Sequence, residues 1–303
     1  MTEEPHIPQT LGQALQYCSD TLAASDAFYG HGTDNPWDEA VQLVLSLADL
    51  PMDAQEAVLP HPVDAHFLAR LKSLMGQRIE QRIPMPYLLG KAWFAGLEFL
   101  CDERALIPRS PLAELILSEF QPWYVGAKPQ RVLDLCCGGG CIGLAVAHYY
   151  PELHVDLLDL DEGALSLARE NAAQLGVQER VSIGQSDLFS ALQNQQYDLI
   201  LSNPPYVNAA DLASMPREYR HEPELALGSG EDGLMLARRI LAQAGQFLRP
   251  DGLLVVEVGN SGEALEEEFP DVPFTWLEFE HGGDGVFALT FQEWQDYKES
   301  LVR

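Results

Sequence analysis

The chain has 303 residues, 47% of them hydrophobic, and carries a formal net charge of −28. This length and composition exclude a mainly disordered chain and allow one large domain, or a large domain with a smaller one. So acidic a surface repels phosphate backbones, which makes duplex nucleic acid a poor partner and a basic protein a good one, although acidity also serves solubility alone.

The N-terminus is acidic and contains proline, without the basic start and apolar stretch of a signal peptide. No run of about 18 apolar residues follows, so we expect a cytoplasmic protein with no membrane segment. The five cysteines are odd in number and form no C-x-x-C pair. They predict neither a disulfide framework nor a zinc site, and we expect no bound metal.

Residues 10 to about 80 have apolar positions at three- and four-residue spacing, which predicts helices over 11–25, 38–50 and 63–82. We interpret 1–88 as a helical domain that recognises a protein substrate. Pro84 and Pro86 end this pattern, and the aromatic, Gly-punctuated sequence that follows predicts a β-hairpin linker over 89–109.

From residue 110 to 303 strands and helices alternate, which predicts an α/β domain with a mostly parallel sheet and helices on both faces. The expected strands are 131–137, 154–161, 180–187, 197–205 and 252–260, with helices over 141–150, 162–176 and 233–248. Two last strands over 273–280 and 283–294 follow, one of them expected to be antiparallel to the rest.

The first strand of this domain runs into a glycine-rich turn, from Asp134 through Cys136 and Gly138 to Gly140. Glycines let the backbone approach a ligand and leave the N–H groups of the helix start free. Such a turn alone fits dinucleotides as well as nucleosides.

Acidic residues at the ends of the next two strands narrow the choice. Asp159, about 20 residues after the glycines, can accept both hydroxyls of a ribose. Asp187 can receive the amino group of an adenine, while Leu188 or Phe189 packs on the ring. This spacing predicts a class I methyltransferase that binds S-adenosylmethionine. Helix capping is the alternative for Asp159 and Asp187, and Asp161 is equally good as the cap of the following helix.

The fourth strand stops at Asn203-Pro204-Pro205-Tyr206, where two prolines cannot continue a ladder and stiffen a loop at the carboxyl end of the sheet. The Asn203 side chain and the Pro204 backbone each offer a carbonyl to one hydrogen of a planar –NH2 group, on which Tyr206 can stack. No general base is required before attack, so we expect no catalytic histidine. The motif predicts methylation of a planar amino group, either a glutamine amide or the amino group of adenine.

At these residues the sequence resembles the protein glutamine N5-methyltransferases, the family of the peptide-chain release factor enzyme. The resemblance runs from about residue 84 to the end and includes PxxYLLG, FxGLxF, LIPR, LDLCCGGG, LLDLD, SNPPYV and GGDGVF. It implies a Rossmann-like class I fold with a seven-stranded sheet and S-adenosylmethionine as cofactor.

Carried over position by position, the resemblance implies a glutamine site at Asn203, Pro204, Pro205 and Tyr206, with catalytic roles for Asn203, Pro204 and Tyr206. The expected cofactor residues are Asp134, Cys136, Gly138, Gly140, Asp159, Asp187, Leu188 and Asn203. Cys136 and Cys137 replace the Gly-Thr common in the family. This departure affects how closely the backbone can approach the amino-acid part of the cofactor.

Three segments distinguish two branches of the family. Release-factor enzymes usually continue LIPR with P-E-T or P-D-T, whereas Ser110-Pro111-Leu112 follows Arg109 here. This segment, with Glu218–Leu225 and Glu257–Ser261, resembles the branch that methylates a glutamine of the third large-subunit ribosomal protein. A basic ribosomal protein modified around ribosome assembly is therefore the expected partner, and a release factor is the alternative.

An adenine-N6 methyltransferase would want a basic face, which the helical N-terminus lacks, and a cofactor-binding module without catalysis would tolerate loss of Asn203. The loop from Val207 to about Gly233 is long enough to act as a lid or substrate cradle. The alternative to a binding role is that the charged residues of this loop are simply solvated. They are Arg217, Arg220, Glu222 and Glu224.

Overall fold

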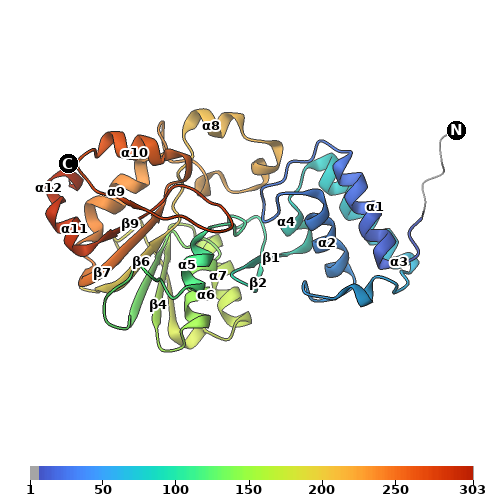
Figure 1. The fold of residues 1–303 in the computed structure, drawn as a ribbon, viewed down its shortest axis with the longest axis horizontal. Helices are drawn as coiled ribbons and strands as arrows, with labels where there is room; N and C mark the ends of the chain where they lie inside the picture. The colour runs from blue at the N-terminus through green and yellow to red at the C-terminus, as the bar shows by residue number, and fades with distance from the viewer. Residues whose placement is uncertain (1–6, 303) are drawn as a thin grey trace. The chain divides into compact units, whose positions relative to one another are not determined.

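The computed structural model of the chain describes residues 7–302, which form two compact units (Figure 1). The first unit contains the described residues up to Ala92 together with Pro216–His221. The second contains Trp93–Met215 and the described residues from Glu222 onward. A short piece of the long loop after Tyr206 therefore belongs to the helical unit. The domain predicted from the sequence, residues 1–88, does not include this piece.

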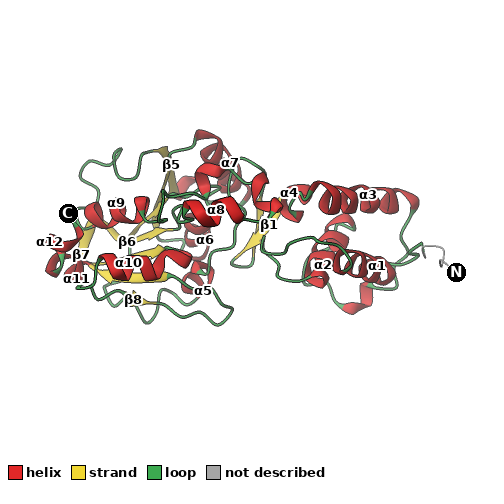
Figure 2. Cartoon of the chain, turned by 90° about the horizontal axis from the view of Figure 1, so that it is seen from above, coloured by secondary structure: helices red, strands yellow, loops and turns green. Residues whose placement is uncertain are grey.

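Helices make up the first unit (Figure 2). Thr10, Asn35 and Asp64 cap three of them by accepting backbone N–H bonds with their side chains, which satisfies donors that a helix start leaves unpaired. Leu43 and Leu71 lie in the apolar core between the helices. The elements are α1 (Leu11–Ala23), α2 (Pro36–Leu47), η1 (Glu56–Val58), α3 (Ala65–Gly76), the π-helix η2 (Gln77–Gln81), α4 (Met85–Leu89) and η4 (Arg217–His221).

A buried ion cluster joins η4 to the rest of the first unit. The Arg78 guanidinium donates to Glu39 at 2.6 Å, to Glu218 at 3.2 Å and to the backbone carbonyl of Phe28 at 2.6 Å. The backbone N–H of Phe28 donates in turn to Glu218 at 2.9 Å. All three charged side chains are buried, so each needs its partners to offset the loss of water.

The chain passes from the first unit to the second through a β-hairpin. Strands β1 (Lys91–Phe94) and β2 (Leu97–Leu100) pair in a two-stranded sheet. Ala95 and Gly96 form the turn with φ angles of 49° and 76°, values that favour glycine. Residues 101–110 then run without helix or strand to the start of α5 (Leu112–Leu117).

The second unit is built on a seven-stranded sheet with the order β5-β4-β3-β6-β7-β9-β8. β3 to β7 are parallel, and β9 runs antiparallel to both of its neighbours, which confirms the expected architecture. The strands are β3 (Arg131–Leu135), β4 (His154–Asp159), β5 (Val181–Gln185), β6 (Tyr197–Ser202), β7 (Leu248–Glu257), β8 (Thr275–Trp276) and β9 (Val286–Thr290).

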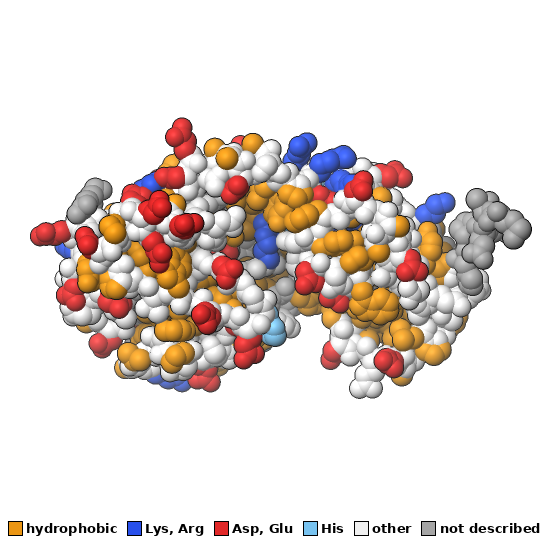
Figure 3. Space-filling view, turned by 45° about the horizontal axis from the view of Figure 1, so that its top comes forward, with side chains coloured by type: hydrophobic (Ala, Val, Ile, Leu, Met, Phe, Trp, Pro, Cys, Tyr) orange, Lys and Arg blue, Asp and Glu red, His pale blue; other side chains and the backbone are white. Residues whose placement is uncertain are grey.

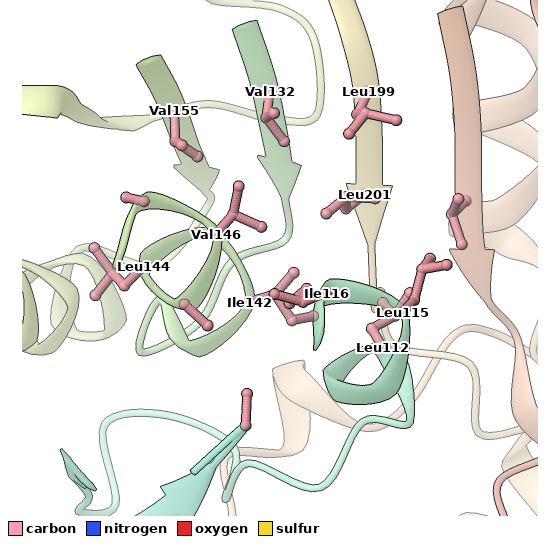
Figure 4. Packing of buried hydrophobic residues seen from close by; sticks show 14 of the residues in the cluster. Leu112, Leu115, Ile116, Val132, Ile142, Leu144, Val146, Val155, Leu199 and Leu201 are labelled. Atoms are coloured by element: carbon pink, nitrogen blue, oxygen red, sulfur yellow. The ribbon is translucent and has the colours of Figure 1, made fainter. Parts of the chain in front are cut away.

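Helices cover both faces of this sheet. Successive residues of a strand point to opposite faces, so Leu199 and Leu201 of β6 pack on one side and Ile200 on the other. The first side is covered by α5, α6 (Cys141–Tyr149) and α7 (Glu162–Gln174), as Figure 4 shows for α5 and α6. The second is covered by α9 (Met235–Ala244), α10 (Gly262–Glu268), α11 (Phe291–Asp296) and α12 (Lys298–Leu301). The remaining helices are η3 (Gln178–Arg180), α8 (Ala209–Ser214), η5 (Glu224–Ala226) and η6 (Gly259–Ser261).

Candidate functional site

A cavity of about 530 Å³ lies in the second unit, where the carboxyl ends of the parallel strands meet. Its wall includes the residues that follow four of these strands: 136–139 after β3, 158–161 of β4 and its end, 186–188 after β5, and Asn203 with Pro205 after β6. Open parallel sheets bind ligands at this edge, and the volume is in the range of about 300–1,000 Å³ usual for small-molecule sites.

Gly138 and Asp159 form one corner of the cavity. Gly138 has a φ of 53°, and a Cβ atom there would find only Ala105 within 4.0 Å, so its backbone is open to a ligand. Its N–H donates to Oδ2 of Asp159 at 2.8 Å, while Oδ1 of Asp159 accepts the N–H of Asp161 at 2.9 Å. Burial raises the pKa of Asp159. Its carboxylate is held in place by backbone donors and faces the cavity with its remaining lone pairs.

The capping alternatives for the two strand-end acids do not apply. Asp161, rather than Asp159, caps α7, because its Oδ1 accepts the N–H of Ala164 at 2.8 Å. Asp187 makes a two-oxygen ion pair with Arg239, at 2.8 Å to each oxygen, and these bonds lower its pKa. Both partners of this pair line the cavity beside Leu188, which is buried.

Asp134 and Gly140 lie behind the wall of the cavity and are not part of it. Asp134 is fully buried and accepts the N–H of Gly143 at 2.7 Å. Burial raises its pKa to about 7. Gly140 has a φ of 84°, and a Cβ atom there would lie 2.9 Å from Leu144 and 3.1 Å from Ala168. Both residues shape the turn from behind the cavity wall, and the cofactor-binding role expected of them stays a prediction.

Asn203 and Pro205 line the cavity at the end of β6, while Pro204 and Tyr206 do not. In residues 7–302 no hydrogen bond engages the Asn203 side chain, so its amide is available to a ligand. Tyr206 instead donates its hydroxyl to Oε1 of Glu257 at 3.0 Å. Two residues of the motif thus lie on the cavity wall, while Pro204 is buried and Tyr206 is half-buried against Glu257.

Sequence analysis missed several residues of this site. Asn171 of α7 lines the cavity and bonds the carbonyl of Gly139 at 3.0 Å and both backbone groups of Leu100, which fixes the glycine turn. Glu257 was noted only as the first residue of the segment Glu257–Ser261, and its contact with Tyr206 was not predicted. Neither contact could be inferred without the fold, because each joins segments far apart in the chain.

The loop after Tyr206 contributes a third contact that was not predicted. Glu222 is buried and accepts hydrogen bonds from Arg109 at 3.0 Å and from the N–H of Ile107 at 3.1 Å, so it is not a solvated loop charge. Arg217, Arg220 and Glu224 are exposed. Pro223, Leu225, Ala226 and Gly228 line the cavity, which places this end of the loop over the site.

The donor set fits a nucleoside better than a metal. The cavity wall combines an open glycine backbone, a fixed carboxylate at Asp159 and the apolar side chain of Leu188, which suit the ribose and the ring of an adenosine. Residues 7–302 contain no group of three or more His, Cys, Asp or Glu that could hold a metal ion. The four cysteines on the wall, Cys101, Cys136, Cys137 and Cys141, have pKa values raised by burial and are thiols rather than thiolates.

Comparison with known proteins gives a consistent result. Residues 113–216 match the family model of the methyltransferase small domain. The chain is 44% identical over 299 residues to the ribosomal protein uL3 glutamine methyltransferase of Francisella tularensis, covering 97% of this chain and 94% of that protein. It is 45% identical over 284 residues to the protein of the same name from Xanthomonas campestris, covering 94% of this chain and 92% of that protein.

Solved structures resemble the chain in fold. The catalytic domain of hMettl16 in complex with the MAT2A 3′UTR hairpin 1 superposes with a TM-score of 0.52 at 19% identity, covering 88% of this chain and 96% of that one. The same domain in complex with hairpin 6 gives a TM-score of 0.51 at 18% identity, covering 75% of this chain and 82% of that one. At this identity the likeness shows the fold alone.

Proposed function

Because the chain belongs to the family of the ribosomal protein uL3 glutamine methyltransferases, we propose that it transfers one methyl group from S-adenosylmethionine to the side-chain amide of a glutamine in uL3. The observation that carries this proposal is the place of Asn203, on the wall of the cavity that Gly138 and Asp159 also form. Acceptor and cofactor residues thus share one small space.

S-adenosylmethionine, when bound, supplies an electrophilic methyl group on a sulfonium centre. Of the residues that line the cavity, Asp159 would accept the ribose hydroxyls, Gly138 would offer its open backbone, and Leu188 would pack on the adenine. Asp187 receives the adenine amino group with oxygens that Arg239 holds in place. These residues would hold the cofactor in the cavity that Asn203 at the end of β6 also lines, where it would supply its methyl group.

The acceptor amide is a poor nucleophile because its nitrogen lone pair is delocalised into the carbonyl. The Asn203 side-chain carbonyl and the Pro204 backbone carbonyl each accept one hydrogen of the amide. These two acceptors favour the positive charge that develops on the nitrogen as it attacks, and they hold it in line with the methyl group. The N–CH3 bond forms as the S–CH3 bond of the sulfonium breaks, which leaves a neutral thioether. The nitrogen becomes acidic only as it gains the methyl group, so no general base is needed before attack, and its proton then passes to water.

The remaining assignments follow from the same proposal. The first unit recognises the folded protein around the glutamine, and the partner is basic, as the charge of −28 favours. On the face in Figure 3, acidic side chains are spread over the surface. No helix within residues 7–302 is long and apolar enough to span a membrane. We propose that the enzyme acts in the cytoplasm, because its relatives are named as methyltransferases of a ribosomal protein.

A complementation experiment tests the proposal. A bacterial strain that lacks its own uL3 glutamine methyltransferase is transformed with this chain, and uL3 and the class I release factors are purified and mapped by peptide mass spectrometry. We expect a methylated glutamine to return in uL3 while the release factors stay as they were. Methylation of the release factors alone would assign the chain to the sister branch.

A further inference from the structure

Three side chains form a hydrogen-bonded cluster behind the acceptor loop. Glu257, the last residue of β7, is only 5% exposed. One of its oxygens accepts the hydroxyl of Tyr206 at 3.0 Å, and the other accepts the hydroxyl of Ser110 at 2.6 Å. Ser110 itself lines the cavity and accepts the N–H of Leu112 at 3.2 Å. The cluster joins segments that are 51 and 147 residues from Glu257 in the chain.

Glycines hold the ring and the backbone of Tyr206 in the same place. A Cβ atom on Gly259, whose φ is 47°, would lie 2.4 Å from the Tyr206 ring. A Cβ atom on Gly233, whose φ is 80°, would lie 2.2 Å from the Tyr206 carbonyl oxygen, which also accepts the Ser261 hydroxyl at 2.9 Å. No larger residue fits at either glycine without moving Tyr206, so Tyr206 is tightly packed against both glycines.

The two prolines transmit this constraint to the cavity. Each fixes its own φ near about −65°, and the residue before a proline is restricted as well. Few soft backbone torsions therefore remain between Tyr206 and the backbone of Asn203 and Pro204. A tyrosine fixed at one end of the motif thus fixes the direction of the Pro204 carbonyl and the point from which the Asn203 side chain extends into the cavity.

We propose that Glu257 is a positioning residue for the methyl acceptor, which acts by anchoring the Tyr206 hydroxyl and thereby aiming the Asn203 and Pro204 carbonyls at the amide. This inference rests on the proposed function. A carboxylate suits the task because it offers an acceptor to each of two hydroxyls, and a bond to a charged acceptor is stronger than a neutral one. Ser110 fixes the second oxygen and so keeps the carboxylate from rotating.

Steady-state kinetics of four variants test the proposal, with the full chain and whichever protein acceptor the wild type labels. Glu257→Ala should lower kcat about 10- to 100-fold, the equivalent of one hydrogen bond to a charged group. Its KM for the acceptor and its Kd for S-adenosylmethionine should stay within about threefold of the wild type, because both ligands bind mainly elsewhere. Tyr206→Phe should lower kcat by a similar factor.

The double variant distinguishes anchoring from general loosening. If Glu257 acts through Tyr206, Glu257→Ala combined with Tyr206→Phe should be no slower than the slower single variant, because the second change removes nothing further. Glu257→Gln should retain kcat within about fivefold, since its amide still offers an acceptor to one hydroxyl and a donor to the other. Asp198→Asn is the matched control, because Asp198 is a buried carboxylate at the amino end of β6, bound to Arg249, and should leave kcat unchanged.

Each outcome decides the matter. Equal kcat for the wild type and Glu257→Ala, or a double variant whose loss is the product of the two single losses, would overturn the inference and leave the proposed function standing. If Glu257→Ala does not fold, a Tyr206→Phe enzyme as fast as the wild type overturns it equally. A wild type that labels no protein glutamine overturns the proposed function, and this inference with it.

Discussion

The backbone N–H of Gly138 donates to Oδ2 of Asp159 at 2.8 Å, which ties the turn after β3 to the end of β4 at the cavity wall. The same carboxylate also accepts the N–H of Asp161. The Asp159 side chain thus fixes the glycine turn and also presents acceptors to the cavity. Both the shape of the cavity wall and the binding of a ligand therefore depend on it.

Replacing this acid should weaken cofactor binding. In Asp159→Ala the ribose hydroxyls lose their acceptor and the Gly138 N–H loses its partner, so the Kd for S-adenosylmethionine should rise about 10- to 100-fold by calorimetry. Asp64→Ala is the control, because it removes the cap of α3 in the first unit and should lower stability by about 1 kcal/mol without changing that Kd. An Asp159→Ala protein that binds as tightly as the wild type would refute the ribose assignment.

Asp134 should make stability depend on pH. Its pKa is raised by burial from 3.8 to about 7, so the folded state keeps a proton that the unfolded chain releases. The contribution of this residue to the free energy of unfolding should therefore fall as pH rises from about 4 to about 7, by up to a few kcal/mol. Urea titrations at several pH values should show this fall in the wild type relative to Asp134→Asn. Parallel curves for the two proteins would contradict it.

The buried ion cluster of the first unit should be sensitive to loss of one partner. Arg78→Met leaves Glu39 and Glu218 without their shared cation, and should destabilise the protein by about 3–5 kcal/mol. Arg169→Ala breaks a pair with Glu162 in which both side chains are about half exposed, and should cost less than about 1 kcal/mol. Urea midpoints followed by circular dichroism compare the two. Equal losses would mean that the cluster is not what holds η4.

Association with a basic acceptor should weaken with salt. The charge of −28 attracts a basic protein over a distance that shrinks from about 10 Å at 0.1 M salt to about 3 Å at 1 M. KM for the protein acceptor should rise at least about tenfold across this range while kcat stays constant. A short uncharged peptide carrying the glutamine is the control and should show no such rise. A KM for the whole protein that ignores salt would exclude electrostatic recruitment.

The sequence was sufficient for the parts of the structure that depend on local pattern. Strand and helix periodicity predicted the sheet and its antiparallel last strand, and the strand-end positions of Asp159, Asp187 and Asn203 bring all three to one cavity. Parallel strands place their carboxyl ends at one edge, so residues that follow different strands meet whatever their separation in the chain.

The features that the sequence did not predict depend on packing between distant segments. Gly140 was predicted as a ligand contact, and the packing reason for a glycine there, the close approach of Leu144 and Ala168, was not. The pairing of Tyr206 with Glu257 is set by the register of two neighbouring strands and by the loops that follow them, which no local pattern encodes. The same holds for the transfer of Pro216–His221 to the helical unit, which depends on the buried Arg78.

Methyl transfer from tritiated S-adenosylmethionine to purified uL3 and to a class I release factor tests the central claim most directly. The wild type should label uL3 on a glutamine, and Asn203→Ala should be about 10²–10³-fold slower, because it lacks one of the two carbonyls that stabilise the charged nitrogen. Asn208→Ala, which removes only the cap of α8 five positions on, should label uL3 at the wild-type rate. Label on the release factor alone, on neither protein, or on uL3 at equal rates with the wild type and Asn203→Ala would contradict the account.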